Sequence, residues 1–277
     1  MRVALVQCDS RVGDLEANLA AAKTAIGQAA DGGADLIVFP ELALQGYPLG
    51  RYDGVPLRSD DSRMSDLAAQ AKTALAIGFH EDAGLHSYNS VAYFQNGSLL
   101  HVQRKLYLPN YDIWEERKHF TPGQALRAFR TAHGGTGILT CNDAWQPFLP
   151  FLLAQDGAEL IIIPADSADT RAPEVLDTHA YWQELLRSMA RMNELWAVFV
   201  NRVGTSGGLE YWGGSCVVDP AGLVIAEAPV KQEAVIFADI DLADARRRRR
   251  ELPLLKDARL GFLARELARL IDAGGDA

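Results

Sequence analysis

Three polar residues of different chemistry stand directly after short apolar runs, where predicted strands end. Glu41 follows "LIVFP", Lys105 follows "LLHVQR" and Cys141 follows "GILT". A structural cysteine lies within an apolar run, whereas a reactive one stands at the end of an element, where backbone N–H groups and solvent reach it. Because strand ends meet at the rim of a sheet, we expect these three side chains to converge.

A thiol, a carboxylate and an ammonium group in one place support cleavage of an amide or a nitrile. The thiolate attacks the electrophilic carbon, while the carboxylate takes the thiol's proton and later returns one to the departing nitrogen. The ammonium group stabilises the negative charge that grows on the tetrahedral oxygen, and it also favours the thiolate. This chemistry requires no metal and no organic cofactor, so the sequence predicts neither.

Each residue also has a structural interpretation when it is taken alone. Glu41 fits a carboxylate that caps a strand, and Lys105, beside an arginine, fits a solvated pair on an edge strand. Cys141 fits a small buried hydrophobic residue. Cys8 and Cys216 lie within apolar segments, and we expect both in the core. The catalytic interpretation therefore depends on all three residues occurring together.

A papain-like pair of Cys141 with a histidine is the competing catalytic arrangement. The chain has six histidines, His80, His86, His101, His119, His133 and His179. None has a protease-like local pattern, although one sequence does not exclude a pairing in space. The segment "HEDAGLH" places its second histidine too far along the chain for a HExxH zinc site, so zinc is not predicted.

Composition and charge indicate an ordinary globular protein. Its 277 residues are 48% hydrophobic and 23% charged, with a formal net charge of −9. That negative balance argues against a nucleic-acid partner, which would require a basic face. The one basic run, "ARRRRRE" at 245–251, follows "FADIDLADA" and precedes "LPLL", and we interpret it as a solvated helix face.

The cysteines and the apolar runs predict a cytoplasmic protein. Three widely spaced cysteines without a CxxC pair fit a reducing compartment and no disulfide framework. The N-terminal segment "MRVALVQCDS" has too short an apolar core for a signal peptide. The longest apolar run, "LIIIPA", is far too short to span a membrane, so no membrane association is expected.

Helical and strand-like patterns alternate along the chain and predict a mixed α/β fold. The expected helices cover residues 14–33, 62–74, 146–157, 174–194 and 259–273. The expected strands cover residues 2–8, 34–42, 75–81, 136–141, 158–165 and 195–204, with hairpins at 89–109 and 213–228. The hairpins exclude a purely parallel sheet. With no repeat or linker, the simplest expectation is one domain over 1–277, in which 258–277 form an amphipathic C-terminal helix and tail.

The three contexts together resemble the nitrilase superfamily, the carbon–nitrogen hydrolases. The matching segments are "GGADLIVFPELALQGYP", "VQRKLYLPNYDIWEERKHFTPG" and "GILTCNDAWQP", followed by "NRVG" and "YWGGSCVVDPAGLVIAEA". The resemblance runs from about residue 2 to about residue 259. The middle segment is most similar to the glutamine-amidase domain of NAD synthetase, whereas "SGGLEY" lacks the Asp-Ser ending of that enzyme's pyrophosphate loop.

The resemblance implies a fold and a set of roles. The expected fold is an αββα four-layer sandwich that pairs through its helices, as a homodimer or a higher homo-oligomer. Glu41 would be the general base and acid, Lys105 the oxyanion stabiliser and Cys141 the nucleophile. The backbone N–H of Asn142 would be a second oxyanion donor. A second glutamate assists many members, and Glu116 fits that position better than its neighbour Glu115.

Residues near the three motifs are candidates for a substrate pocket. By position in the family, Tyr47, Trp145, Asp166 and Ser167 would line it, although each fits a packing or turn role equally well. An Asp166 that faces the substrate would favour a cationic amine group there. The residues after Cys141 are Asn-Asp, where nitrilases usually have Trp-Glu, and this difference favours amides over nitriles.

The resulting functional hypothesis is hydrolysis of a non-peptide C–N bond in a small amide. The reaction would pass through a thioester on Cys141 and release ammonia or an amine. One alternative is a catalytically inactive member that binds a metabolite or a partner. Another is a glutaminase-like subunit that supplies ammonia to a separate synthetase.

Overall fold

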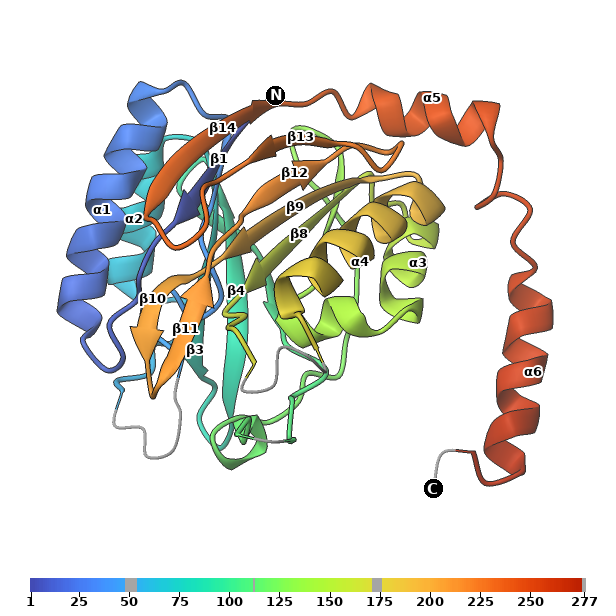
Figure 1. Ribbon diagram of the computed structural model, residues 1–277, viewed down its shortest axis with the longest axis horizontal. Helices are drawn as coiled ribbons and strands as arrows, with labels where there is room; N and C mark the ends of the chain where they lie inside the picture. The colour runs from blue at the N-terminus through green and yellow to red at the C-terminus, as the bar shows by residue number, and fades with distance from the viewer. Residues whose placement is uncertain (48–53, 112, 171–175, 276–277) are drawn as a thin grey trace.

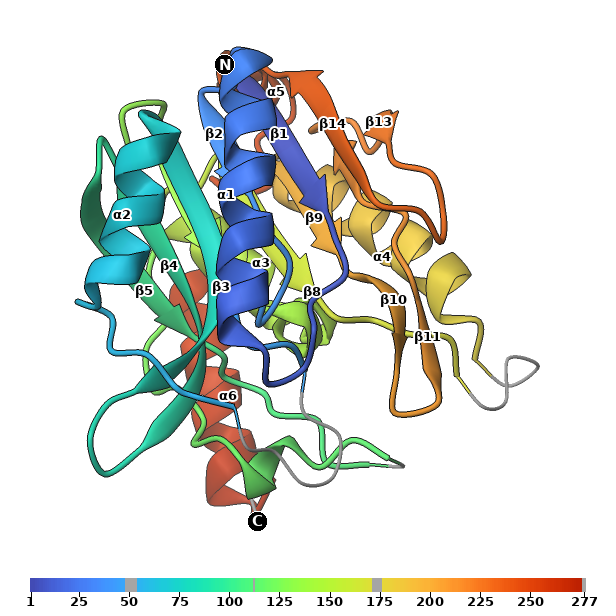
Figure 2. The ribbon, with the colours of Figure 1, turned by 90° about the vertical axis from the view of Figure 1, so that its left-hand side faces the viewer.

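Two six-stranded mixed β-sheets pack face to face, and helices cover both outer faces (Figures 1 and 2). The structure is a computed structural model that describes residues 1–47, 54–111, 113–170 and 176–275. Apolar side chains fill three layers between these elements. The four-layer αββα arrangement expected from the sequence is confirmed.

The first sheet has the strand order β14-β1-β2-β3-β4-β5. These strands are β14 (Ala234–Asp239), β1 (Arg2–Gln7), β2 (Leu36–Val38), β3 (Ala74–Asp82), β4 (Ser87–Gln95) and β5 (Ser98–Arg104). The pairs β1–β2 and β2–β3 are parallel, and the other pairs are antiparallel. The turn between β4 and β5 is Asn96-Gly97, and both residues have positive φ, at 50° and 77°. This conformation matches the twist of a two-residue hairpin, and it explains why the sequence at 89–109 forms the expected hairpin.

The second sheet has the order β13-β12-β9-β8-β7-β6. Its strands are β13 (Val224–Glu227), β12 (Cys216–Val218), β9 (Trp196–Asn201), β8 (Leu160–Ala165), β7 (Gly135–Ile138) and β6 (Phe129–Arg130). The strands β7, β8 and β9 are parallel. A separate antiparallel hairpin consists of β10 (Val203–Ser206) and β11 (Leu209–Trp212).

Two helices cover each sheet, and two more follow the last strand (Figure 1). Those on the first sheet are α1 (Leu15–Asp31) and α2 (Ser62–Ala71), and those on the second are α3 (Phe148–Gln155) and α4 (Thr178–Asn193). The last two are α5 (Ala243–Glu251) and α6 (Leu260–Asp272). Two short 3-10 turns, η1 (Glu116–Lys118) and η2 (Cys141–Trp145), lie in the loops. No helix among the described ranges is long and apolar enough to cross a membrane.

The alternation of side chains along the strands explains the layered core. In β1, Ala4 and Val6 pack towards α1 and α2, while Val3 and Leu5 pack between the sheets. The inner layer is completed from the second sheet by residues such as Ile162. Both faces of the central strands are therefore apolar, which is why they appear in the sequence as continuous hydrophobic runs.

Two features of the fold differ from the sequence-based expectation. Strand β14 pairs with β1 along its whole length, from Arg2 with Asp239 to Gln7 with Ala234, although no strand was expected there. The hairpin β10–β11 was also missed. Pairing between segments more than 200 residues apart is invisible to local periodicity, and β14 is only partly buried.

The arginine run is not simply a solvated face. It forms α5, and two of its side chains bind the body of the protein. Arg246 donates to Glu159 at 2.8 Å, and Arg249 donates to the carbonyl oxygen of Ala158 at 2.6 Å. The expectation was wrong in this respect, because a charge pattern along one helix does not show which acceptors a neighbouring loop presents.

Candidate active site

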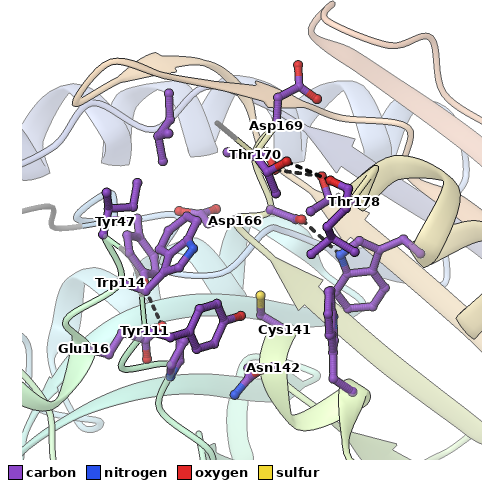
Figure 3. Close-up of a pocket in the computed structure, with 18 residues that line it drawn as sticks. Tyr47, Tyr111, Trp114, Glu116, Cys141, Asn142, Asp166, Asp169, Thr170 and Thr178 are labelled. Carbon is purple, nitrogen blue, oxygen red and sulfur yellow. Dashed lines mark hydrogen bonds between the residues drawn. The ribbon is translucent and has the colours of Figure 1, made fainter. Parts of the chain in front are cut away.

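The three strand-end residues come from both sheets, and Glu41 and Lys105 lie close enough to Cys141 for their charges to act on its thiol. Glu41 lies three residues beyond β2, and Lys105 directly follows β5, in the first sheet. Cys141 lies three residues beyond β7, in the second sheet, and begins η2. Cys141 lies beside the pocket together with Glu116 and Asn142 (Figure 3). The predicted convergence therefore occurs across the interface between the two sheets.

Lys105 is the centre of a buried charge cluster. Its Nζ donates to Oε1 of Glu41 at 2.6 Å and to Oε1 of Glu116 at 2.5 Å, and its side chain is fully buried. Burial lowers the pKa of this amine, but the charges of Glu116 and Glu41 outweigh it and hold the pKa well above the usual value. Lys105 therefore remains a cation at neutral pH.

Glu41 is held in one orientation by donors on both of its oxygens. Besides Lys105, its Oε1 accepts from Nδ2 of Asn89 at 2.7 Å, and its Oε2 accepts from the backbone N–H of Asp166 at 2.9 Å. Strand β3 passes very close to the backbone of this glutamate. A Cβ at Gly78 would lie 2.4 Å from the carbonyl oxygen of Pro40, so only glycine fits there.

Glu116 joins the cluster, and Glu115 does not. Oε1 of Glu116 accepts from Nζ of Lys105 and from the hydroxyl of Tyr47 at 2.5 Å. Its Oε2 is buried and has no hydrogen-bond partner among the described residues. Burial raises the pKa of Glu116 to about 7, against the opposing effect of Lys105. Glu115 instead forms a surface ion pair with Lys118. The geometry thus favours Glu116 as the assisting glutamate.

Cys141 has an uncommon backbone conformation and a protonated thiol. Its φ is +46°, a left-handed value that costs a non-glycine residue about 1–3 kcal/mol and recurs at functional sites. Burial and the charge of Glu41 raise the pKa of the thiol well above its usual value, although Lys105 lowers it. The expected effect of Lys105 is present but outweighed, so the thiol needs a base to remove its proton.

The pocket beside Cys141 has aromatic walls and acidic groups. Its aromatic lining residues are Tyr47, Tyr111, Trp114, Trp145 and Trp182. Its acidic lining residues are Glu116, Asp166 and Asp169. No histidine is found among the described residues that line the pocket. Figure 3 shows Tyr111 near the Cys141 sulfur and Trp114 beside Tyr47. Such a pocket suits a small molecule with an apolar body.

All four predicted pocket residues line this pocket, and each of them also contacts other residues of the chain. Tyr47 donates to Glu116, as described above. Trp145 stacks on Tyr181 with ring centroids 4.3 Å apart. The hydroxyl of Ser167 accepts from the indole N–H of Trp182 at 3.0 Å. These side chains therefore both pack against other residues and line the pocket.

Asp166 faces a cation that the chain itself supplies. Its Oδ2 lies 3.9 Å from Nη1 of Arg202, and both side chains are almost fully buried. Arg202 also donates to Asp9 at 2.9 Å. Burial raises the pKa of Asp166 well above its usual value, and Arg202 opposes that rise. The charge of Arg202 weakens the argument that Asp166 selects a cationic substrate.

Sequence reasoning missed several residues around the site. Asn89 lies on β4 and fixes both Glu41, by its side chain, and Lys105, whose N–H donates to its carbonyl oxygen at 2.8 Å. Tyr111 and Trp114 line the pocket from the loop between β5 and η1. No local pattern marks Asn89, because its importance depends on which strand lies next to β5. The aromatic content of "NYDIW" was the available signal for the other two.

The chain matches a known family model over most of its length. Residues 2–250 match the carbon–nitrogen hydrolase model. A glutamine-dependent NAD(+) synthetase of Thermotoga maritima is 32% identical over 87% of this chain, which spans only 42% of that protein. A citrullinase of Francisella tularensis is 30% identical, covering 94% of this chain and 95% of the relative. An N-carbamoylputrescine amidase of Arabidopsis thaliana is 28% identical, covering 89% and 88%.

Solved structures show the same fold. A carbon–nitrogen hydrolase from Helicobacter pylori G27 has a TM-score of 0.86 at 25% identity, covering 96% of this chain and 98% of the other. A variant of an amidase from Nesterenkonia sp. AN1 has a TM-score of 0.78 at 25% identity, covering 96% of both chains. That amidase carries the acetamide moiety of fluoroacetamide covalently added at its active-site cysteine. The chain described here therefore belongs to the carbon–nitrogen hydrolase family and is an amidase-type hydrolase of the nitrilase superfamily.

Proposed function

We propose that the protein hydrolyses a small amide through a thioester on Cys141 and releases ammonia or an amine. The observation that carries this proposal is the buried cation of Lys105, held by Glu41 and Glu116 beside a pocket that opens on the thiol. The proposal agrees with the names of relatives that match over nearly their whole length, which include amidases. It also agrees with the covalent adduct formed at the active-site cysteine of the Nesterenkonia amidase.

The first half of the reaction forms the thioester. Glu41 takes the proton from Cys141 as the sulfur attacks the amide carbon, which is consistent with a thiol that is protonated at rest. The oxygen becomes negative, and Lys105 and the backbone N–H of Asn142 stabilise it. The intermediate then collapses, the C–N bond breaks, and Glu41 gives its proton to the departing nitrogen.

The second half regenerates the enzyme. Water gives a proton to Glu41 as it attacks the thioester carbon, and the same oxyanion donors stabilise the second tetrahedral intermediate. The C–S bond then breaks, the acid leaves, and the sulfur recovers a proton from Glu41. Oε2 of Glu116, which has no hydrogen-bond partner within the described part of the chain, is suited to accept an N–H from the substrate amide and so to orient it.

The proposal is tested by a panel of small amides with detection of ammonia and mass spectrometry of the protein. A slow substrate should add the mass of its acyl group to the peptide that contains Cys141. Cys141→Ala should lose turnover by about 10⁴-fold or more and show no adduct. Cys216→Ala, a matched change at a buried cysteine, should retain activity. Full activity of Cys141→Ala would overturn the proposal. The site around Cys141 would then have a role in binding at most, and the hydrolysis would take place elsewhere.

A second candidate function is that of a subunit that supplies ammonia. The similarity to glutamine-dependent NAD(+) synthetases favours it. Adding a separate ammonia-dependent synthetase should then stimulate glutamine hydrolysis. If glutamine is not hydrolysed while other amides are, this candidate is excluded and the free-standing amidase remains.

We also infer that the protein forms a homodimer or a higher homo-oligomer. None of the described residues of α6 is buried, although Leu260, Leu263, Leu267 and Leu270 form one apolar side of it. A groove beside α3 and α4 is apolar as well. Its lining includes Phe148, Phe151 and Met192, together with Leu263 from α6. Exposed apolar surfaces of this kind mark association sites, and copies of this chain would supply both surfaces at once.

A further inference from the structure

Asp143 is a buried carboxylate that stands two residues after the nucleophile and outside the pocket. It is the third residue of η2, its side chain is fully buried, and it is not among the residues that line the pocket. It therefore does not face the space in which a bound molecule would lie. Burial raises the pKa of Asp143 to about 7, while the N–H of Tyr107 and the charge of Lys105 oppose the rise. Above that pH it is an acceptor on both oxygens.

The carboxylate accepts hydrogen bonds from backbone on both sides of the site. Its Oδ1 accepts from the N–H of Leu106 at 3.0 Å and of Tyr107 at 2.7 Å. Its Oδ2 accepts from the N–H of Thr140 at 3.3 Å. Leu106 and Tyr107 follow Lys105 out of the first sheet, whereas Thr140 precedes Cys141 at the edge of the second. One side chain thus joins the two segments that carry the cation and the thiol.

The neighbouring residue adds a bond of the same kind. Nδ2 of Asn142 donates to the carbonyl oxygen of Tyr107 at 3.1 Å. The backbone N–H of Asp143 donates to the carbonyl oxygen of Thr140 at 3.0 Å, which closes the turn around Cys141. The turn that holds the nucleophile in its left-handed conformation is therefore the same turn that binds the segment after Lys105.

This connection matters because the ammonium group of Lys105 and the thiol of Cys141 belong to different sheets. Lys105 is fixed in its own sheet by its N–H, which donates to Asn89, and by its carbonyl oxygen, which accepts from Gly123, both at 2.8 Å. Those bonds do not set its separation from Cys141. An oxyanion donor acts only when it lies within hydrogen-bond distance of the developing charge, and an error of about 1 Å costs about 10²-fold in rate.

We infer that Asp143 is a positioning residue that holds the Lys105 segment against the Cys141 turn, so that Lys105 and the N–H of Asn142 face the same oxygen. The inference rests on the proposed function for the roles of Lys105 and Asn142. Asp143 acts through the backbone of Leu106 and Tyr107, and it transfers no proton to or from the substrate. Removing its second acceptor oxygen should therefore affect the chemical step more than substrate binding.

The first test compares Asp143→Asn with Asp219→Asn at pH 8. Asp219 is a matched control, because its Oδ1 also accepts two backbone N–H groups, from Ala221 at 2.9 Å and Leu223 at 2.8 Å, in the turn between β12 and β13. Asp143→Asn should lower kcat by about 10–100-fold and change KM by less than about threefold. Asp219→Asn should keep both within about twofold at a comparable loss of thermal stability. A folded Asp143→Asn with normal kcat would overturn the inference, and so would a change in KM alone.

The second test is a double-mutant cycle that needs no turnover. The rate at which iodoacetamide alkylates Cys141 is measured in the wild type, Asp143→Asn, Lys105→Met and the double variant. Lys105 lowers the pKa of the thiol, so displacing or removing it should slow alkylation. If Asp143 acts through Lys105, Asp143→Asn should have little further effect in the Lys105→Met background. Additive effects would contradict the inference, even if no substrate had been found.

The native protein provides a measurement that does not depend on the variant folding. The amide hydrogens of Leu106 and Tyr107 should exchange with solvent at least about 100-fold more slowly than in an unstructured chain, because Asp143 accepts both. Exchange at the unprotected rate would show that the bonds do not persist and would overturn the inference. Failure of the amidase proposal would instead appear as a lack of turnover with both amides still protected.

Discussion

The charge cluster around Lys105 is buried and paired within one chain, whereas the apolar side of the C-terminal helix α6 is left exposed to solvent. In the cluster, Glu41 and Lys105 have fully buried side chains, and their charged atoms bind partners from the same chain. On α6, Leu267 remains 51% exposed and Leu260 47% exposed. Figure 1 shows α6 standing apart from the sheets, beyond α5.

This difference in burial indicates that a single chain can form the catalytic cluster, but that the apolar side of α6 would need a second chain to cover it. Burying an ion costs several kcal/mol unless it is paired, so the cluster can exist only because its partners are already present. An apolar helix face in water loses about 25 cal/mol for each Å² that it fails to bury, a penalty that folding tolerates but association relieves. We therefore expect catalysis to depend on the cluster and assembly to depend on α6.

The largest effect is expected at the centre of the cluster. Lys105→Ala should lower kcat by about 10³-fold or more, because it removes an oxyanion donor and leaves Glu41 and Glu116 as neighbouring unpaired carboxylates. Steady-state kinetics on the amide found in the substrate panel measures it. Lys118→Ala, in a surface ion pair with Glu115, is the control and should retain activity. Near-normal turnover by Lys105→Ala would mean that the cluster is structural.

The next effect concerns the protonation of Cys141. Its thiol pKa is raised, so the thiol is protonated at neutral pH and the thiolate fraction grows as pH rises towards that pKa. Alkylation by iodoacetamide should therefore increase by about tenfold per pH unit, or about 100-fold from pH 7 to pH 9, without levelling off. Peptide mass spectrometry reads the rate at each cysteine. A plateau below pH 8 would show a thiolate already stabilised by Lys105.

A smaller change in activity is expected when the apolar side of α6 is altered. Leu263→Asp with Leu267→Asp should shift the protein from a homo-oligomer to a monomer, as measured by sedimentation, because it places charges on the face that we expect to be buried. Activity should stay within about threefold, since the cluster is complete in one chain. Glu266→Gln, on the same helix, is the control. An unchanged sedimentation coefficient of an oligomer would assign assembly to another surface.

The smallest effect is expected at Asp166. Because Arg202 already faces this carboxylate, Asp166→Asn should change the ratio of kcat/KM for matched cationic and neutral amides by less than about threefold. The pair of substrates should differ only in a terminal ammonium or methyl group. A large loss of selectivity for the cationic amide would show that Asp166 binds a cationic group of the substrate, as the sequence suggested.

The sequence predicted the components of the site better than their interactions. Apolar runs before Glu41, Lys105 and Cys141 were sufficient to place each at a strand end, because strand length is a local property. The pairing of β14 with β1 and the contacts of Arg246 with Glu159 were not predictable in this way. They join segments far apart along the chain, and periodicity contains no information about such pairs.

The amino-acid sequence by itself determined the residue types, the alternation of strands and helices, and the apolar side of α6. Only the tertiary structure decided the electrostatic state of the site, including the raised pKa of Cys141 and the charge of Arg202 opposite Asp166. It alone also brought Asp143 between two sheets. The physical reason is that burial and Coulomb interactions depend on distances through space, and folding sets those distances between residues that the sequence keeps apart.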